Sequence, residues 1–179
     1  MIDDIYKNIN LPIIKKGKNY TYGEILYEGV TKIFDHLDLK DKKFLDIGSG
    51  IGKIVIQLSL KYPLLLSQGI ELCKERYLIS NNVKNKIKNK DIKNKIEFYN
   101  KNIFEYHSLN YDIIFFSNLC FSEFQNQVIG NILSKNKYTI LISLKKITNL
   151  NKFLKYYICD IKTSWSDNQI VYYYYIQNT

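Results

Sequence analysis

Short apolar runs alternate with longer amphipathic stretches along most of the chain. Runs rich in β-branched and aromatic residues predict strands at residues 43–47, in a run ending at 69–71, and at 96–99, 113–116 and 138–142. Helical spacing of apolar positions predicts helices from residue 54 to a stop near Pro63, at 74–90 and at 122–133. This alternation is typical of a parallel sheet whose strands are joined by crossover helices.

The stretch 74–90 has a well-marked amphipathic pattern. Its apolar residues Tyr77, Leu78, Val83 and Ile87 are predicted to face the core, and its lysines to face solvent. We therefore expect one continuous helix here.

The two ends of the chain depart from the alternating pattern. Runs at 157–162 and 170–176 are separated by polar residues around Asp167 and predict an antiparallel hairpin. Residues 1–40 are expected to form a leading lobe with a helix over 22–37, and residues 41–179 the core, within a single compact domain. A parallel sheet that ends in a hairpin is the plan of class I methyltransferases.

Composition and charge narrow the class of protein. The 179 residues are 46% hydrophobic, which suffices for one buried core, and no apolar run approaches the ~20 residues of a membrane span. The first residues lack a signal-peptide pattern, so we expect a soluble protein of the cytoplasm or nucleus, in a host cell if its source is a virus or an intracellular bacterium. We also expect it to be a monomer. The net charge of +9 favours nonspecific contact with nucleic acid, although lysine-rich runs such as 81–95 are equally typical of a solvated surface in a protein of AT-rich coding bias.

A glycine-rich loop follows the strand predicted at 43–47. It reads FLDIGSGIGK over residues 44–53, and its glycines let the backbone turn tightly beside a ligand. Glu71, at the predicted end of the next strand, is placed to accept hydrogen bonds from the hydroxyls of a ribose. From the loop and this acid we expect a nucleoside cofactor to contact Asp46, Gly48, Ser49, Gly50, Gly52, Lys53 and Glu71.

Asp46 favours one cofactor over others. Glycine spacing of this kind also occurs in nicotinamide-binding enzymes, and a tight turn without a ligand is a further reading. An acid directly before the turn suits the cationic methionine end of S-adenosylmethionine, whereas a dinucleotide fold keeps that place free for pyrophosphate. A phosphate-binding loop is disfavoured, because no Lys-Ser or Lys-Thr pair follows the glycines at the required spacing.

Further motifs occur in an order that resembles a known family, the disruptor-of-telomeric-silencing histone H3 lysine methyltransferases, which use a class I fold. The matching segments are Tyr22-Gly23-Glu24, the loop at 44–53, Glu71, Ser117-Asn118-Leu119-Cys120-Phe121, Ser143-Leu144-Lys145, Thr163-Ser164-Trp165-Ser166 and Tyr172. The resemblance spans about residues 22–176. It implies a mostly parallel seven-stranded sheet with a C-terminal antiparallel hairpin and helices on both faces.

The resemblance also implies an activity and a set of site residues. The activity is transfer of a methyl group, without a metal, from S-adenosylmethionine to a lysine of histone H3, a nucleosome or another basic protein, which leaves S-adenosylhomocysteine. Beyond the residues already given, the cofactor would contact Tyr22, Glu24, Asn102, Ile103 and Ser117. The catalytic residues would be Asn118, Ser117, Tyr172, Phe121 and Trp165.

The chain departs from the family pattern at two places in this site. Ser117 replaces the first asparagine beside the methyl donor, so either Ser117 or Asn118 must take its role, and Asn102-Ile103 stands where the family has Asp-Phe. Phe121 and Trp165 could instead be core aromatics, and a shift of one residue would exchange Tyr172 for a neighbouring tyrosine. Two alternatives stay open: a nucleic-acid methyltransferase, disfavoured because residues 117–121 lack proline, and a cofactor-binding protein without catalysis.

Overall fold

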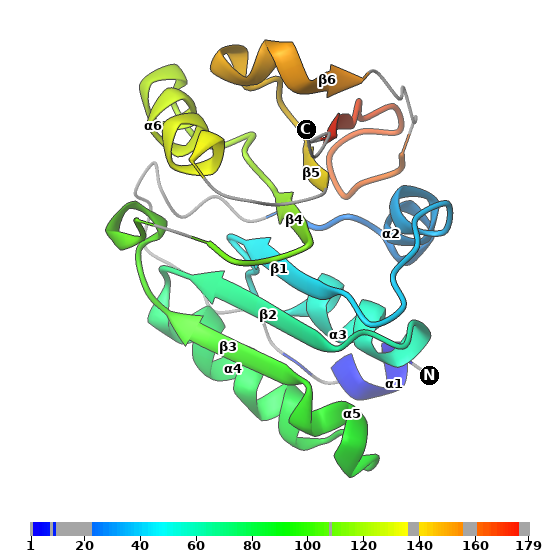
Figure 1. The fold of residues 1–179 in the computed structure, drawn as a ribbon. Helices are drawn as coiled ribbons and strands as arrows, with labels where there is room; N and C mark the ends of the chain where they lie inside the picture. Colours follow the sequence, from blue (N-terminus) through cyan, green and yellow to red (C-terminus); the bar gives the residue numbers. More distant parts are fainter. Residues whose placement is uncertain are drawn as a thin grey trace.

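The fold is known from a computed structural model, which describes residues 2–7, 9, 23–107, 109–135, 140–155 and 161–175. One seven-stranded sheet forms its centre, with strand order β3-β2-β1-β4-β5-β7-β6 (Figure 1). The strands are β1 Lys43–Ile47, β2 Leu66–Glu71, β3 Ile96–Asn100, β4 Ile113–Phe116, β5 Ile140–Ser143, β6 Leu154–Lys155 and β7 Tyr172–Tyr175. Strands β1 to β5 pair in parallel, whereas β7 is antiparallel to both β5 and β6. The predicted fold class is confirmed.

Helices cover both faces of the sheet because strand residues alternate between two apolar clusters. Phe44, Ile113 and Phe115 pack on the face covered by α2 (Tyr27–Phe34), α3 (Lys53–Lys61) and α4 (Lys74–Asn85). Leu45 and Phe116 pack on the opposite face, beneath α6 (Glu123–Ser134), η2 (Ile103–Glu105) and η3 (Thr148–Phe153). Among the described residues, no helix has the length and apolarity to cross a membrane.

The prediction of one helix over 74–90 is wrong in two respects, the position of its C-terminal end and one of the residues assigned to its buried face. Helix α4 stops at Asn85, and a separate α5 (Lys90–Asn94) begins after Asn89, whose side chain accepts hydrogen bonds from the amides of Asp91 and Ile92 at 2.9 and 3.1 Å. Leu78 is 49% exposed instead of facing the core. Arg76 and Ser80 are buried with Val83 on the inner face.

The C-terminal strands also differ in position from the prediction. On its outer edge β7 pairs with the short β6, which lies upstream of the predicted run 157–162. Residues 157–160 of that run lie outside the described residues. Ile161 instead forms an isolated antiparallel bridge with Gln169. Strand β5 begins at Ile140, and the predicted start at Tyr138, like Ile176 at the other end, falls outside the described residues.

The leading segment packs into the same core as the sheet. Helix α1 (Ile2–Tyr6), which the pattern did not predict, lies beside α3 in Figure 1. Helix α2 begins at Tyr27, later than the predicted Tyr22, which is outside the described residues. Its buried Val30 and Ile33 join the cluster beneath α3.

Gly29 allows α2 to lie directly against a neighbouring backbone segment, which generates a stability prediction. A Cβ added at Gly29 would lie 2.7 Å from the carbonyl oxygen of Lys162. Glycine to alanine in a helix normally stabilises by up to about 1 kcal/mol, but overpacking against a fixed backbone costs about 1–3 kcal/mol. We expect Gly29→Ala to lower the free energy of unfolding by about 1–2 kcal/mol in urea titrations.

Gly130 of α6 is the matched control. A Cβ there would meet the side chain of Asn149, which is exposed and able to swing away. Gly130→Ala should therefore change the unfolding free energy by no more than about 1 kcal/mol, because helix propensity offsets the hydrogen bonds that Asn149 loses. Equal effects of the two substitutions would contradict the packing assigned to Gly29.

Candidate active site

A cavity of about 710 Å³ opens at the carboxyl ends of the parallel strands. This is the edge of an open α/β sheet where ligands bind, because crossover loops meet there. The predicted site residues that line it are Glu24, Asp46, Gly48, Ser49, Gly50, Lys53, Glu71, Asn102, Ile103, Ser117, Phe121 and Trp165.

The glycine loop is fixed by hydrogen bonds to β2. The amides of Gly48 and Ser49 donate to the carbonyl oxygen of Ile70 at 2.9 and 3.0 Å, and the amide of Gly50 donates to the Glu71 carboxylate at 2.8 Å. Gly52 is left-handed, with φ of +84°, and a Cβ there would clash with the ring of Phe98. It lies behind the lining residues and precedes α3, so its role is to let the loop turn and pack.

Two buried acids, Asp46 and Glu71, interact electrostatically in the site. Glu71 accepts from the amides of Gly50 and Cys73, both at 2.8 Å. Asp46 is 2% exposed, and its Oδ1 has no hydrogen-bond partner among the described residues. Burial, together with the nearby charge of Glu71, raises the pKa of Asp46 to about 8. An unpartnered buried carboxyl of this kind fits a cationic ligand group.

The segment 23–25 and the turn 163–165 are joined as an antiparallel pair. Ile25 bridges Thr163, the Ser164 amide donates to the Glu24 carbonyl oxygen at 2.8 Å, and the Glu24 amide donates to the Ser164 hydroxyl oxygen at 2.9 Å. The Trp165 ring lies so close to Gly23 that a Cβ there would clash with it. This pairing brings two motifs from opposite ends of the sequence to one wall of the cavity.

The Glu24 carboxylate forms an ion pair with Lys53 at the start of α3. The Lys53 ammonium also lies 5.4 Å from the centroid of the Tyr6 ring of α1. Lys53 therefore brings a positive charge, paired with Glu24, to the cavity that Asp46 and Glu71 also line, so the cavity has groups suited to a zwitterion. No group of three or more His, Cys, Asp or Glu side chains within the described part of the chain could hold a metal ion.

Asn102 and Ile103 form a second part of the cavity, beyond Glu71. Asn102 caps η2 by accepting from the Phe104 amide at 3.1 Å, and Ile103 is 5% exposed. Leu72 and Phe104 line the same part but were missed by sequence reasoning. The signal for Leu72 was its place directly after Glu71.

The end of β4 supplies the opposite part of the cavity. Ser117 and Phe121 line it, and the Phe121 ring packs edge-on against Phe116 with centroids 4.9 Å apart. Cys120 and Gln125 also line it and were missed. The capping box between Ser122 and Gln125 at the start of α6 was the available signal.

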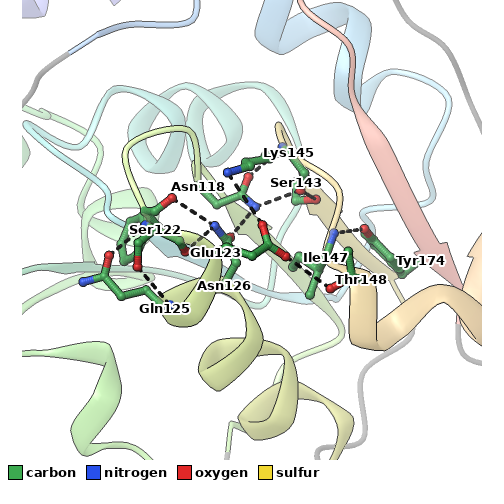
Figure 2. Close-up of polar contacts among 11 residues, drawn as sticks. Asn118, Ser122, Glu123, Gln125, Asn126, Ser143, Lys145, Ile147, Thr148 and Tyr174 are labelled. Atoms are coloured by element: carbon green, nitrogen blue, oxygen red, sulfur yellow. Dashed lines mark hydrogen bonds and ion pairs between the residues drawn. The ribbon is translucent and has the colours of Figure 1, made fainter.

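Two predicted catalytic residues lie away from the cavity lining. Asn118 is fully buried, and its side-chain amide makes four internal hydrogen bonds that use both its donors and both acceptor positions. Its partners Asn126 and Lys145 are shown in Figure 2. Tyr172 pairs with Ser143 of β5 and packs on the apolar cluster beneath α6. Direct contact of either side chain with a ligand is thus not what the geometry favours, and a catalytic role for them stays a prediction. Tyr22 lies outside the described residues.

The strand order and the cavity at the strand ends define the class I S-adenosylmethionine-dependent methyltransferase fold. Magnesium protoporphyrin IX methyltransferase from Synechocystis PCC 6803, solved with bound SAM, is similar over 97% of this chain and 88% of its own, with a TM-score of 0.67 and 13% identity. An RNA methyltransferase from Salinibacter ruber, solved with S-adenosyl-L-homocysteine, is similar over 93% and 95%, with a TM-score of 0.63 and 16% identity. At these identities the likeness shows the fold alone.

The family described as "Histone methylation protein DOT1" matches residues 6–173, and the chain belongs to this family of S-adenosylmethionine-dependent methyltransferases. Several curated relatives carry the name "Histone-lysine N-methyltransferase, H3 lysine-79 specific". The relative from Eremothecium gossypii is 38% identical over 72 residues, which cover 39% of this chain and 12% of the relative. The relative from Drosophila melanogaster is 41% identical over 51 residues, which cover 28% of this chain and 3% of the relative. The chain thus matches only a small part of these relatives.

The pKa of Asp46 leads to a prediction for ligand binding. At pH 7 the free carboxyl is protonated, because its pKa is about 8. The ammonium of S-adenosylhomocysteine favours the ionised form, so binding should release a proton, and affinity should rise from pH 6 to about 8 and then level off.

Calorimetry in buffers of different ionisation enthalpy measures this proton release. The slope is at most about tenfold in affinity per pH unit. Asp46→Asn is the control, and it should bind more weakly with no proton release. A wild-type affinity that does not change with pH would contradict the role assigned to Asp46.

Proposed function

We propose that the protein is a protein lysine N-methyltransferase that acts on histone H3 or another basic protein. The observation that carries the proposal is the family match over residues 6–173 together with a single cavity that combines a cofactor end and an apolar acceptor end. The family name supports a histone as the substrate, and the relatives' names support a lysine of histone H3.

At the cofactor end, the residues present fit S-adenosylmethionine, which supplies an electrophilic methyl group when bound. Asp46 would bind the methionine ammonium, and Lys53, beside Glu24, would bind the methionine carboxylate. Glu71 would accept from the ribose hydroxyls through lone pairs that the Gly50 and Cys73 amides leave available. The Asn102-Ile103 segment would hold the adenine, with Ile103 packing on its ring.

At the acceptor end, the side chains favour a lysine in its neutral form. Phe121 and Trp165 give apolar surface to the cavity, and desolvation by such surface lowers the pKa of an incoming ammonium. The Ser117 hydroxyl would orient the amine in line for displacement. The aromatic faces would then hold the methylated cation.

The charge of the chain bears on the partner. A net charge of +9 repels a free basic protein but is attracted to a polyanion, so nucleosomes should be better substrates than free histones. Nonspecific contact with nucleic acid would supply this attraction. A chromatin substrate would place the enzyme in the nucleus or wherever viral or bacterial DNA is packaged by basic proteins.

Transfer of labelled methyl groups tests the proposal. The purified chain is incubated with labelled S-adenosylmethionine and, in separate reactions, nucleosomes, free histones, DNA and RNA. We expect label in histone H3 and more of it with nucleosomes, with the excess lost at high salt. Label in nucleic acid only would favour the nucleic-acid methyltransferase alternative. Cofactor binding without transfer to any of these substrates would favour a cofactor-binding protein without catalysis.

Ser117 provides a matched mutational test of the acceptor end. Ser117→Ala removes the hydroxyl at the end of β4, and we expect kcat to fall roughly tenfold because amine alignment is lost, with a smaller loss of affinity for S-adenosylhomocysteine. Ser134→Ala, which removes an exposed hydroxyl bonded to the Asn131 carbonyl oxygen in α6, is the control. Unchanged kcat in Ser117→Ala would remove Ser117 from the reaction.

A further inference from the structure

The acceptor end of the cavity has two walls that come from separate parts of the chain. One wall is the segment 117–121 after β4, and the other is Trp165 in the turn that pairs with residues 23–25. Alignment of an amine with a methyl donor depends on the distance between these walls, and a misplacement of about 1 Å can cost about a hundredfold in rate. The hydrogen bonds that fix this distance should therefore affect the rate of transfer.

Asn118 anchors the first wall. Its Oδ1 accepts from the amides of Leu144 and Lys145 at 3.1 and 2.7 Å, and its Nδ2 donates to the Lys145 carbonyl oxygen and to the Asn126 side chain, both at 2.8 Å. Asn126, 2% exposed on α6, in turn donates to the Phe121 carbonyl oxygen at 3.1 Å. Figure 2 shows Asn118 between Asn126 and Lys145. The wall is thus held at both of its ends by one buried pair of amides.

Gln169 connects the same backbone to the second wall. Its Nε2 donates to the carbonyl oxygen of Leu144 at 3.0 Å. The amide of the same Leu144 donates to Asn118. Its Oε1 accepts from the indole N–H of Trp165 at 3.2 Å. A path of hydrogen bonds therefore runs from Asn118 through the Leu144 backbone and Gln169 to Trp165.

We propose that Asn118 and Gln169 are positioning residues that fix the two walls of the acceptor end relative to each other through the backbone of Leu144. The effect of this spacing on catalysis rests on the proposed methyl transfer, whereas the coupling between Asn118 and Trp165 does not. Neither side chain needs to touch the substrate. This assigns Asn118 a role that agrees with its burial, and it assigns a role to Gln169, which no sequence motif indicates.

Trp165 is the protein's single tryptophan, so its fluorescence reports on the second wall without any assay of activity. Asn118→Ala removes a side chain of the first wall. We expect a red shift of Trp165 emission and stronger quenching by acrylamide, because the link through Leu144 is lost. The affinity for S-adenosylhomocysteine should stay within about twofold, since the cofactor end is bonded separately through Glu71 and Gly50.

Gln169→Glu is a second variant. Gln169 is only half-buried, so this substitution should disturb folding less than Asn118→Ala at its fully buried position. It keeps an oxygen for the Trp165 indole but places a carboxylate against the carbonyl oxygens of Leu144 and Ile170, to which Gln169 now donates at 3.0 and 2.8 Å. The same shift and quenching are expected. Asn149→Ala is the matched control, because it removes an amide that donates to Gln127 and Asn131 away from this path, and it should leave Trp165 emission unchanged.

A double-mutant cycle separates coupling from general loosening. If Asn118 and Gln169 act as one unit, the change in quenching in Asn118→Ala/Gln169→Glu should be clearly smaller than the sum of the changes in the two single variants. Additive changes, or a Trp165 signal that Gln169→Glu alters and Asn118→Ala does not, would overturn the proposal. In transfer assays each single variant should lower kcat about tenfold, with the cofactor affinity kept.

The outcomes for coupling and for function are distinguishable. Coupled Trp165 signals in a chain that transfers no methyl group would support the positioning pair and sink the proposed function. Methyl transfer by the wild type, with Trp165 signals that are not coupled, would support the proposed function and overturn the positioning pair. Normal kcat in variants with altered signals would overturn the claim that this spacing limits the reaction.

Discussion

The hydrogen bond between the Gly50 amide and the Glu71 carboxylate is the interaction on which the cofactor end of the cavity depends. It joins the glycine loop after β1 to the end of β2, and it uses an acid that a ribose would also need. The same carboxylate places a negative charge near Asp46, whose pKa it helps raise. One side chain thus fixes the loop and adds to the effect of burial on the pKa of its neighbour, so the loop sequence and the strand end must be considered as one unit.

Much of the fold could be predicted because apolar runs that pair in parallel are buried on both faces and stand out in the sequence. The glycine loop was predictable for a related reason, since a tight turn with positive φ restricts residue choice, and the placement of Glu71 at the end of β2 followed from the strand pattern. The C-terminal pairing was not, because β6 has two residues and carries little pattern of its own. Helix α4 ended early since Asn89 starts a new helix, a capping choice that periodicity does not show.

At the end of β4, sequence position identified a segment that lines the cavity but not the direction of its side chains. Ser117 and Asn118 are neighbours at the end of β4, yet Ser117 faces the cavity and Asn118 points into the protein. Tyr172 shares a sheet face with Tyr174, beneath α6, where it packs in the core. Gln169 could not be predicted from the sequence. The role proposed for it depends on a hydrogen bond to the carbonyl oxygen of Leu144, which follows β5 and is distant in sequence.

The pairing of residues 23–25 with 163–165 has a consequence for how the protein is made. Glu24 and Ser164 are 140 positions apart, whereas Gly50 and Glu71 are separated by 21. Contacts between distant residues close long loops and form late, and a chain leaving the ribosome presents its N-terminal part first. The part of the cavity built by the glycine loop and Glu71 can therefore assemble while the chain is still being synthesised, but the wall that contains Trp165 can form only when that residue has emerged. The two ends of the cavity are thus completed at different times during synthesis.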